Sequence, residues 1–146
     1  MKSFCYNYTI QDAGGIYGSY FSPNGTTLGI AHTNSYVNFW DKYNKTKIGT
    51  HNYGTWADRI TYSKNGKYIA VGGQKNIIHI LNSTNFAYIL SINTGIISVA
   101  YKADFRYDDK LLLICGSGNQ IQFWNVPAWT LNKTISLPSY SPYFDC

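Results

Sequence analysis

One apolar pattern occurs three times in this chain, at a spacing close to 40 residues. The copies are FSPNGTTLGIAHTNSYVNFWD from Phe21, YSKNGKYIAVGGQKNIIHILN from Tyr62 and YKADFRYDDKLLLICGSGNQIQFWN from Tyr101. The first two align without a gap, and the third aligns if the loop after Tyr101 is four residues longer. All six positions compared in each copy are apolar. In a chain that is 45% apolar, the probability that all of these positions are apolar by chance is roughly one in a million, before any correction for the choice of register. A fixed period of this size indicates stacked structural units.

Each copy has the pattern of a small antiparallel sheet. Its apolar positions alternate or form short runs, and turn signals such as Asn65-Gly66 separate them. We therefore expect four strands in each unit. The expected inner strands end near Phe21, Tyr62 and Tyr101, the second strands span 28–33, 68–72 and 111–115, the third span 36–41, 77–82 and 121–125, and the outer strands span 47–51, 87–92 and 134–137.

The composition favours an all-β fold. The chain has no glutamate and only one methionine, whereas Tyr, Ile, Val, Thr, Phe and Trp are plentiful, so strand-forming residues replace helix-forming ones. Four strands in about 40 residues is the arithmetic of a β-propeller blade. The sequence thus predicts an incomplete ring, a β-propeller segment of about three four-stranded antiparallel blades in residues 13–137.

Residues 1–12 and 138–146 fall outside the three units. We expect the stretch 4–10 to be the outer strand of a preceding blade, and residues 138–146 to be the start of a further unit or a tail. Closed propellers have ~4 to 8 blades, so three blades cannot close a ring. Open terminal blades expose apolar faces and unpaired edges. We expect either that the chain is a fragment of a longer propeller or that it completes its ring by association.

The run Phe21-Ser22-Pro23-Asn24-Gly25, followed by an apolar strand and then Trp40-Asp41, resembles the tryptophan-aspartate (WD) repeat of β-propellers. The likeness covers roughly residues 13–137, with Leu81-Asn82 and Trp124-Asn125 in place of the Trp-Asp pair in the other two units. The resemblance implies a scaffold that binds other proteins and carries out no catalysis.

Members of that family usually carry an Asp before the third strand, which is hydrogen-bonded through a His near the start of the blade. The corresponding residues here are Asn34, Lys75 and Gly118. We therefore expect this hydrogen-bond network to be absent.

The residues that could carry chemistry do not form a known catalytic or metal-binding pattern. His32, His51 and His79 lack metal-ligand spacing from a Cys, Asp or second His. Asp108-Asp109 is the one adjacent acidic pair, which we interpret as a solvated turn, and there is no phosphate-binding glycine loop. We expect no catalytic residue, cofactor or bound metal, and hence no enzyme.

The chain has three cysteines, at 5, 115 and 146, without a Cys-x-x-Cys pair. We expect reduced thiols, with Cys115 filling the core of an apolar strand. No apolar run is long enough to span a membrane, and no signal peptide is evident. These features favour a cytoplasmic location, with the nucleus as the other intracellular compartment.

Two loop groups on one predicted face are candidate protein-binding sites. The richest lies between the first outer strand and the second inner strand, and the other is formed by turns before third strands. Large aromatic side chains flanked by polar residues are typical of binding hot spots, although any one of them could instead pack under its own loop. The candidates are Tyr53, Trp56, Asp58 and Arg59 in the first group, and Asn34, Tyr36 and Lys75 in the second.

The net charge of +5 permits a different function, the binding of RNA or of an acidic lipid surface. We expect most basic residues on the face opposite the aromatic loops, where they would form a docking surface for an acidic protein, RNA or anionic membrane, or act only as solubilising charges. On the aromatic face, Arg59 and Lys75 are expected to be balanced by Asp12 and Asp58. The basic-face candidates are Lys64, Lys67, Lys102, Arg106 and Lys110, with Phe105 and Tyr107 as stacking residues.

Overall fold

A computed structural model describes residues 12, 14–95, 100 and 102–138 of the chain. Its twelve strands form three four-stranded antiparallel sheets, and the described residues contain no helix. The all-β, three-blade prediction is thereby confirmed. The strands are β1 (Ile16–Phe21), β2 (Thr27–His32), β3 (Tyr36–Asp41), β4 (Lys47–Asn52), β5 (Ala57–Tyr62), β6 (Tyr68–Gly73), β7 (Ile77–Asn82), β8 (Tyr88–Asn93), β9 (Lys102–Phe105), β10 (Leu111–Cys115), β11 (Gln120–Asn125) and β12 (Thr130–Ser136).

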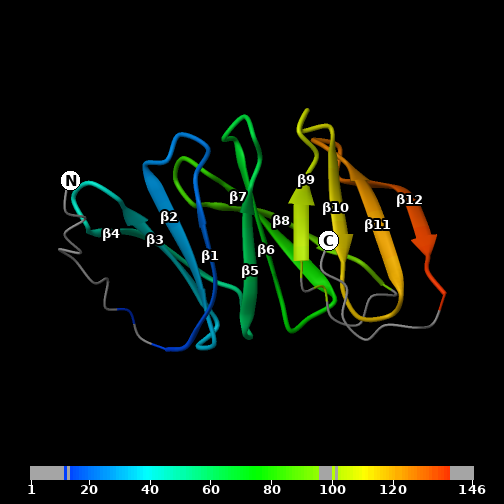
Figure 1. Cartoon of the computed structure of the whole chain (residues 1–146), viewed down its shortest axis with the longest axis horizontal. Coiled ribbons are helices and arrows are strands. Elements are labelled where there is room, and N and C mark those ends of the chain that lie inside the picture. The colour runs from blue at the N-terminus through cyan, green and yellow to red at the C-terminus, as the bar shows by residue number, and fades with distance from the viewer. Residues whose placement is uncertain (1–11, 13, 96–99, 101, 139–146) are drawn as a thin grey trace, which may run out of the picture.

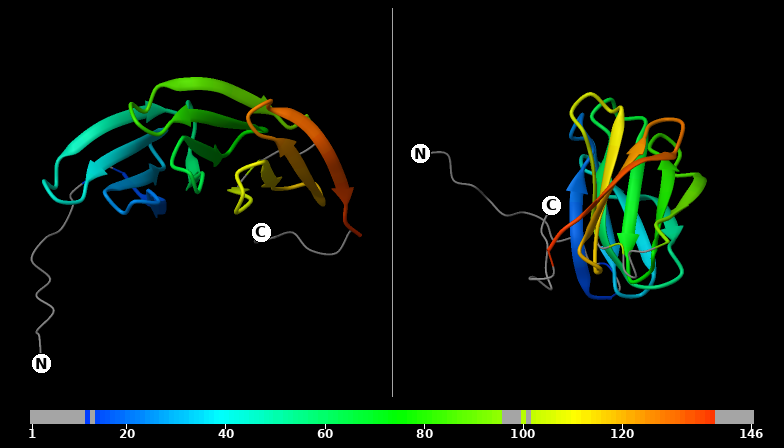
Figure 2. Two further views of the ribbon diagram at one scale, coloured as in Figure 1. Left: turned by 90° about the horizontal axis from the view of Figure 1, so that it is seen from above. Right: turned by 90° about the vertical axis from the view of Figure 1, so that its right-hand side faces the viewer.

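The three sheets are blades that lie side by side (Figure 1) and follow an arc when seen from above (Figure 2). In each blade the strands follow one another in chain order, so that β1, β5 and β9 lie on the concave side and β4, β8 and β12 lie on the convex side (Figure 2). The arc does not close into a ring. Within the described residues no helix is long and apolar enough to cross a membrane. The expected strand at 4–10 and the segment 139–146 lie outside the described residues.

The strand pairing corrects our alignment of the third unit. Phe105 pairs with Leu112 as Phe21 pairs with Leu28 and Tyr62 with Ile69. The first turn therefore has one length in all three blades, and the expected four-residue insertion after Tyr101 is wrong. The sequence was misleading because Lys102 and Asp104 give β9 a polar pattern that resembles a loop.

The same turn is built with different residues in the three blades. Its fourth residue has a left-handed backbone, with φ of 69° at Gly25, 70° at Gly66 and 56° at Asp109. In each blade this residue donates a backbone hydrogen bond to the carbonyl oxygen three positions earlier, at Ser22, Ser63 and Arg106. Asp109 thus occupies a glycine position, which an aspartate tolerates better than most side chains do. The expectation of a turn at 108–109 is confirmed, but the loop predicted around it is shorter than expected because β9 occupies 102–105.

Two apolar clusters hold the blades together. The first, between blades one and two, contains Phe39 and Tyr62, and the second, between blades two and three, contains Ile80, Phe105 and Leu112. Burial of such side chains contributes about 1.5–3 kcal/mol each, so these interfaces fix the relative position of neighbouring blades. The loops at the ends of the strands are consequently held in place by a packed scaffold.

Cys115, the last residue of β10, is disulfide-bonded and buried. Its partner cysteine lies outside the described residues. The expectation that Cys115 is a reduced, core-filling thiol is therefore half right, because the side chain is in the core but it is oxidised. A sequence with three cysteines and no Cys-x-x-Cys pair gives no indication of which two would meet.

Candidate functional site

The loops that enter each blade and the turns between second and third strands form one face of the arc, which we call the connection face. Backbone hydrogen bonds join these two kinds of loop. Tyr53 N donates to Ser35 O at 2.8 Å, and Gln74 N donates to Trp56 O at 3.0 Å. A Cβ on Gly73 would overlap the carbonyl oxygen of Trp56, so glycine is needed for this close approach. Neighbouring loops on the connection face are thus held together by hydrogen bonds between their backbones.

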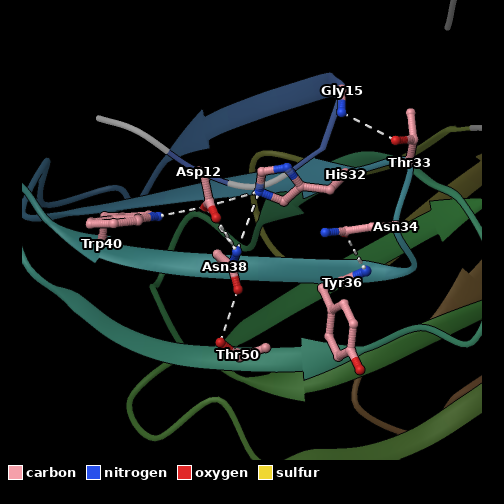
Figure 3. A network of polar contacts seen from close by, with 9 residues as sticks. All are labelled: Asp12, Gly15, His32, Thr33, Asn34, Tyr36, Asn38, Trp40 and Thr50. Atoms are coloured by element: carbon pink, nitrogen blue, oxygen red, sulfur yellow. Dashed lines mark hydrogen bonds and ion pairs between the residues drawn. The ribbon is translucent and has the colours of Figure 1, made fainter. Parts of the chain in front are cut away.

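Three large aromatic side chains are exposed on the connection face. Trp56 is 49% exposed, and its ring lies 6.2 Å from the ring of Tyr17, which is exposed to a similar degree. Tyr36, at the start of β3, is the third (Figure 3). The sequence prediction included Trp56 and Tyr36 but missed Tyr17. Tyr17 is the extra residue of a bulge at the start of β1, equivalent to Asp58 in β5, and the repeat alignment could have identified it.

Tyr53 is a structural residue and not the surface anchor that we expected. Only 1% of it is exposed, and its hydroxyl donates a 2.7 Å hydrogen bond to the carbonyl oxygen of Ile77. Burial is the main reason that the pKa of its phenol is raised. Its ring contacts His79 of β7, so Tyr53 packs at the interface between blades one and two. The alternative that a loop aromatic packs under its own loop applies to Tyr53.

Asp58 and Arg59 lie side by side in sequence but differ in environment. Asp58 is 8% exposed and accepts a 3.1 Å hydrogen bond from the amide of Gln74, and burial raises the pKa of its carboxyl group. Arg59 is exposed, and its Nη1 donates to the carbonyl oxygens of Tyr17 at 2.8 Å and Asp58 at 3.2 Å. The guanidinium is therefore positioned by backbone atoms and makes no hydrogen bond to the Asp58 carboxylate, although its charge acts to lower the pKa of Asp58.

A buried hydrogen-bond network is centred on Asp12, and this corrects our expectation that the blades lack one (Figure 3). Asp12 Oδ2 lies 3.1 Å from His32 Nε2 and accepts a 3.1 Å bond from Trp40 Nε1. Both carboxylate oxygens accept bonds of 2.8 Å from Asn38 Nδ2. Thr50 extends the network to β4 by donating to Asn38 Oδ1. The aspartate comes from the loop that enters the blade, and not from the turn before the third strand where we searched for it.

These two aspartates change the charge of the connection face. Asp12 and Asp58 were expected to cancel Arg59 and Lys75, but both carboxylates point inward to hydrogen-bond donors. Lys102 also belongs near this face, because it begins β9 and pairs with Cys115 at the end of β10. It lines a groove of about 500 Å³ between the inner strands together with Tyr20, Arg59 and Asp104. Lys102 and Asp104 therefore both lie nearer to the connection face than the sequence indicated, and their charges oppose each other in this groove.

The opposite face, formed by the first turns and the β3–β4, β7–β8 and β11–β12 turns, is less suited to nucleic acid than we expected. Phe105 is 2% exposed and belongs to the core, so it cannot stack on a base. Arg106 forms a bidentate ion pair with Asp108, at 2.7 and 2.6 Å, which lowers the pKa of that carboxyl group to about 2. Three of the predicted basic residues remain exposed there, beside the highly exposed Tyr107: Lys64, Lys67 and Lys110.

The described residues contain no cluster of three or more His, Cys, Asp or Glu side chains that could hold a metal ion. His51 and His79, from adjacent blades, do approach each other, with 2.9 Å between Nε2 of His51 and Nδ1 of His79. Burial lowers the pKa of both imidazoles, that of His79 to about 4. Sequence reasoning missed this pair because the two residues are far apart in the chain and meet only when blades one and two pack together.

No family model and no curated protein matches the sequence. Solved structures match the fold: U3-55K with a TM-score of 0.81 and 16% identity, the RRP9 WD40 repeats with 0.81 and 17%, and Kuenenia stuttgartiensis hydrazine synthase with 0.80 and 17%. The matches cover 86%, 86% and 94% of this chain, and the chain spans 40% of the length of each of these structures. At such low identity the likeness shows the fold alone, which is that of a WD40-like β-propeller.

Proposed function

We propose that this chain is a non-catalytic platform that binds another protein through its connection face. The main observation behind the proposal is that Trp56, Tyr17 and Tyr36 are exposed. They lie in loops and at strand ends, next to loops that backbone hydrogen bonds hold together. Aromatic side chains presented on a rigid surface bury a large area at a small loss of conformational entropy, and they are typical of interface hot spots. The WD40-like fold supports the same class of function by analogy.

A second candidate function is the binding of RNA or of an anionic membrane by the opposite face. Lys64, Lys67 and Lys110 are exposed there beside Tyr107. The candidate is weaker, because Arg106 is already paired with Asp108 and Phe105 is buried. Phosphate contacts would make the affinity fall by about 0.7–0.9 log units per log unit of salt for each contact, so titrations at two salt concentrations test it.

We also propose that further blades, from a longer chain or from an associating one, cover the two ends of the arc. Phe21, Tyr62 and Phe105 occupy the same position at the end of the inner strand. Tyr62 and Phe105 are buried by the preceding blade, whereas Phe21 is 49% exposed. The equivalence of these three residues supports the proposal that another blade covers Phe21.

The protein-binding proposal is tested by placing a photo-crosslinking amino acid at position 56 and, as a control, at position 43. Tyr43 is also exposed but lies in the β3–β4 turn of the opposite face. We expect crosslinks to a protein from position 56 and not from position 43. With the purified partner, Trp56→Ala and Tyr17→Ala should each weaken binding by more than about 1 kcal/mol, and Tyr43→Ala should not. Equal crosslinking from both positions, or unchanged affinity, would contradict the proposal.

A further inference from the structure

Among the described residues, the cations at the connection face are Arg59, Lys75 and Lys102, and the carboxylates are Asp12, Asp58 and the partly exposed Asp104. Asp12 is enclosed by donors from His32, Asn38 and Trp40, and Asp58 is buried beside Gln74. The Asp12 carboxylate accepts several hydrogen bonds inside the protein, and the Asp58 carboxylate accepts one from Gln74 and is otherwise buried, so neither is readily accessible to a ligand outside. Of the cations, Arg59 is exposed, and Lys75 and Lys102 are partly exposed. The charge that a partner meets at Arg59 is therefore positive.

Arg59 is prepared to bind a carboxylate. Its Nη1 is held by the carbonyl oxygens of Tyr17 and Asp58, and within the described part of the chain its Nε and Nη2 make no hydrogen bond. A guanidinium fixed at one nitrogen loses less conformational freedom when it binds, and its remaining N–H groups match the two oxygens of a carboxylate. The bond to Tyr17 also places this cation next to the exposed pair of aromatic rings formed by Tyr17 and Trp56.

Lys75 supplies a second charge on the same face, with its Nζ beside Gly54. It lies in the β6–β7 turn, where the residue before it is hydrogen-bonded to Trp56 O. Lys75 forms no ion pair with any residue that the structure describes. Both cations thus lie in elements that are hydrogen-bonded to the backbone of the aromatic pair: Arg59 donates to Tyr17 O, and the residue before Lys75 donates to Trp56 O. This arrangement favours a ligand in which acidic and apolar side chains are close together.

An acidic polypeptide fits this surface better than a nucleic acid does. A phosphate backbone needs a row of cations, and the groove next to Arg59 also contains the carboxylate of Asp104, which accepts a bond from Thr61. A polypeptide can place one or two carboxylates on the cations and avoid Asp104. Its apolar side chains can pack on the aromatic rings.

We propose that the connection face binds an acidic segment of another protein, with Arg59 and Lys75 holding its carboxylates and Trp56 and Tyr17 packing against an apolar side chain. This inference rests on the proposed function, because it names the partner class of the same face. It predicts that affinity depends on carboxylates in the partner, and not only on apolar area.

The test is selection of short random peptides on the full chain, followed by affinity measurements on the selected peptides. We expect the selected peptides to be enriched in Asp and Glu next to Leu, Phe or Trp. Replacing their acids by Asn and Gln should weaken binding about 10-fold, the size expected for loss of a charge-assisted hydrogen bond. Arg59→Gln and Lys75→Gln should weaken the acidic peptides to a similar extent, with Lys64→Gln and Lys67→Gln on the opposite face as matched controls.

The outcomes separate this inference from the proposed function. Selected peptides that depend on Trp56 but not on acids or on Arg59 and Lys75 would overturn the acidic-partner inference and keep the protein-binding platform. Peptides that bind without dependence on Trp56 or Tyr17 would overturn both. Tighter binding of a single-stranded RNA than of any acidic peptide, sensitive to Arg59→Gln, would also overturn the inference. Arg59→Lys should bind the acidic peptides more tightly than Arg59→Gln, because it keeps the positive charge. It should bind them less tightly than the wild type, because a lysine cannot form two parallel hydrogen bonds to a carboxylate.

Discussion

Nε2 of His51 lies 2.9 Å from Nδ1 of His79, and this contact joins the outer strand of blade one to the third strand of blade two. One nitrogen must carry the proton and the other must accept it, so the contact requires at least one neutral ring. The pKa of His79 is lowered to about 4, first by burial and then by the charges of His51 and Lys75. Both rings are therefore neutral at pH 7, and the seam between the two blades depends on that state.

The first prediction concerns pH. Above pH 6.5, the ordinary value, His79 is neutral in both the folded and the unfolded chain and its titration has no effect. As the pH falls from 6.5 towards 4, the unfolded chain binds a proton that the folded chain does not, so folded stability decreases across this window and then levels off. Because His79 is only half buried, solvent screening reduces the expected loss to about 1–2 kcal/mol.

Urea denaturation at a series of pH values measures this effect, with His79→Gln as the comparison. Burial also raises the pKa of Asp58, and the difference between the two proteins isolates the histidine. We expect the wild-type curve to fall more steeply than the variant curve between pH 6.5 and 4. Parallel curves would show that folding does not lower the pKa of His79, and would contradict this prediction.

The second prediction concerns Asp12. Changing it to Asn leaves a donor group where His32, Asn38 and Trp40 all need an acceptor, so buried polar atoms lose their partners. The expected loss of unfolding free energy is about 1–3 kcal/mol. Asp108→Asn removes an exposed carboxylate and should change stability much less. Chemical denaturation of the two variants makes the comparison, and equal effects would mean that the Asp12 network is not stabilising.

The repeat predicted the strands well because each strand has its own local signal. Second and third strands carry three or more apolar or β-branched residues, and their bounds agree with the expected ones to within a residue or two. β9 was misplaced because Lys102 and Asp104 alternate with Ala103 and Phe105, and an alternating strand of four residues is too short to distinguish from a loop. The outer strand β12 begins at Thr130 and not at 134, since its exposed residues show little periodicity.

The candidate site was only partly predictable, because its key relationships join distant residues. Trp56 could be identified from composition, but whether a loop aromatic points outward depends on the neighbouring blade. Tyr53 points inward because Ile77 offers it a carbonyl oxygen. In the same way, the inward position of Asp12 depends on His32, Asn38 and Trp40, which the chain brings together only when the blade is folded.

The third prediction concerns Cys115. A disulfide at this buried position implies that Cys115 does not react with an alkylating reagent under denaturing conditions until a reductant is added. Mass spectrometry of the peptides with and without reductant measures this directly. Reduction should also lower the unfolding free energy, by about 2–4 kcal/mol for a typical disulfide. Alkylation of Cys115 without reductant in freshly isolated protein would mean that the thiol is reduced, as the sequence led us to expect.

The last prediction concerns the ends of the arc. Phe123 is the counterpart of Phe39 and Ile80, which are both fully buried between blades, yet Phe123 is only partly buried and lines an apolar groove of about 290 Å³ with Leu111 and Leu113. Exposed apolar faces on two ends favour association, because covering them removes apolar area from water. We therefore expect light scattering after size-exclusion chromatography to give a mass above that of the 16.5 kDa chain.

Phe21→Ser and Phe123→Ser should each shift this assembly towards the monomer, since each removes an apolar group from one end face. Tyr107→Ser is the matched control, because Tyr107 is more exposed than Phe21 but lies in the first turn of blade three and not on an end face. A lasting monomer of 16.5 kDa with cooperative unfolding would show that the chain needs no further blade. Association that persists in both Phe variants would place the contact elsewhere. The equivalence of Phe21 with Tyr62 and Phe105 would then be no evidence that another blade covers Phe21.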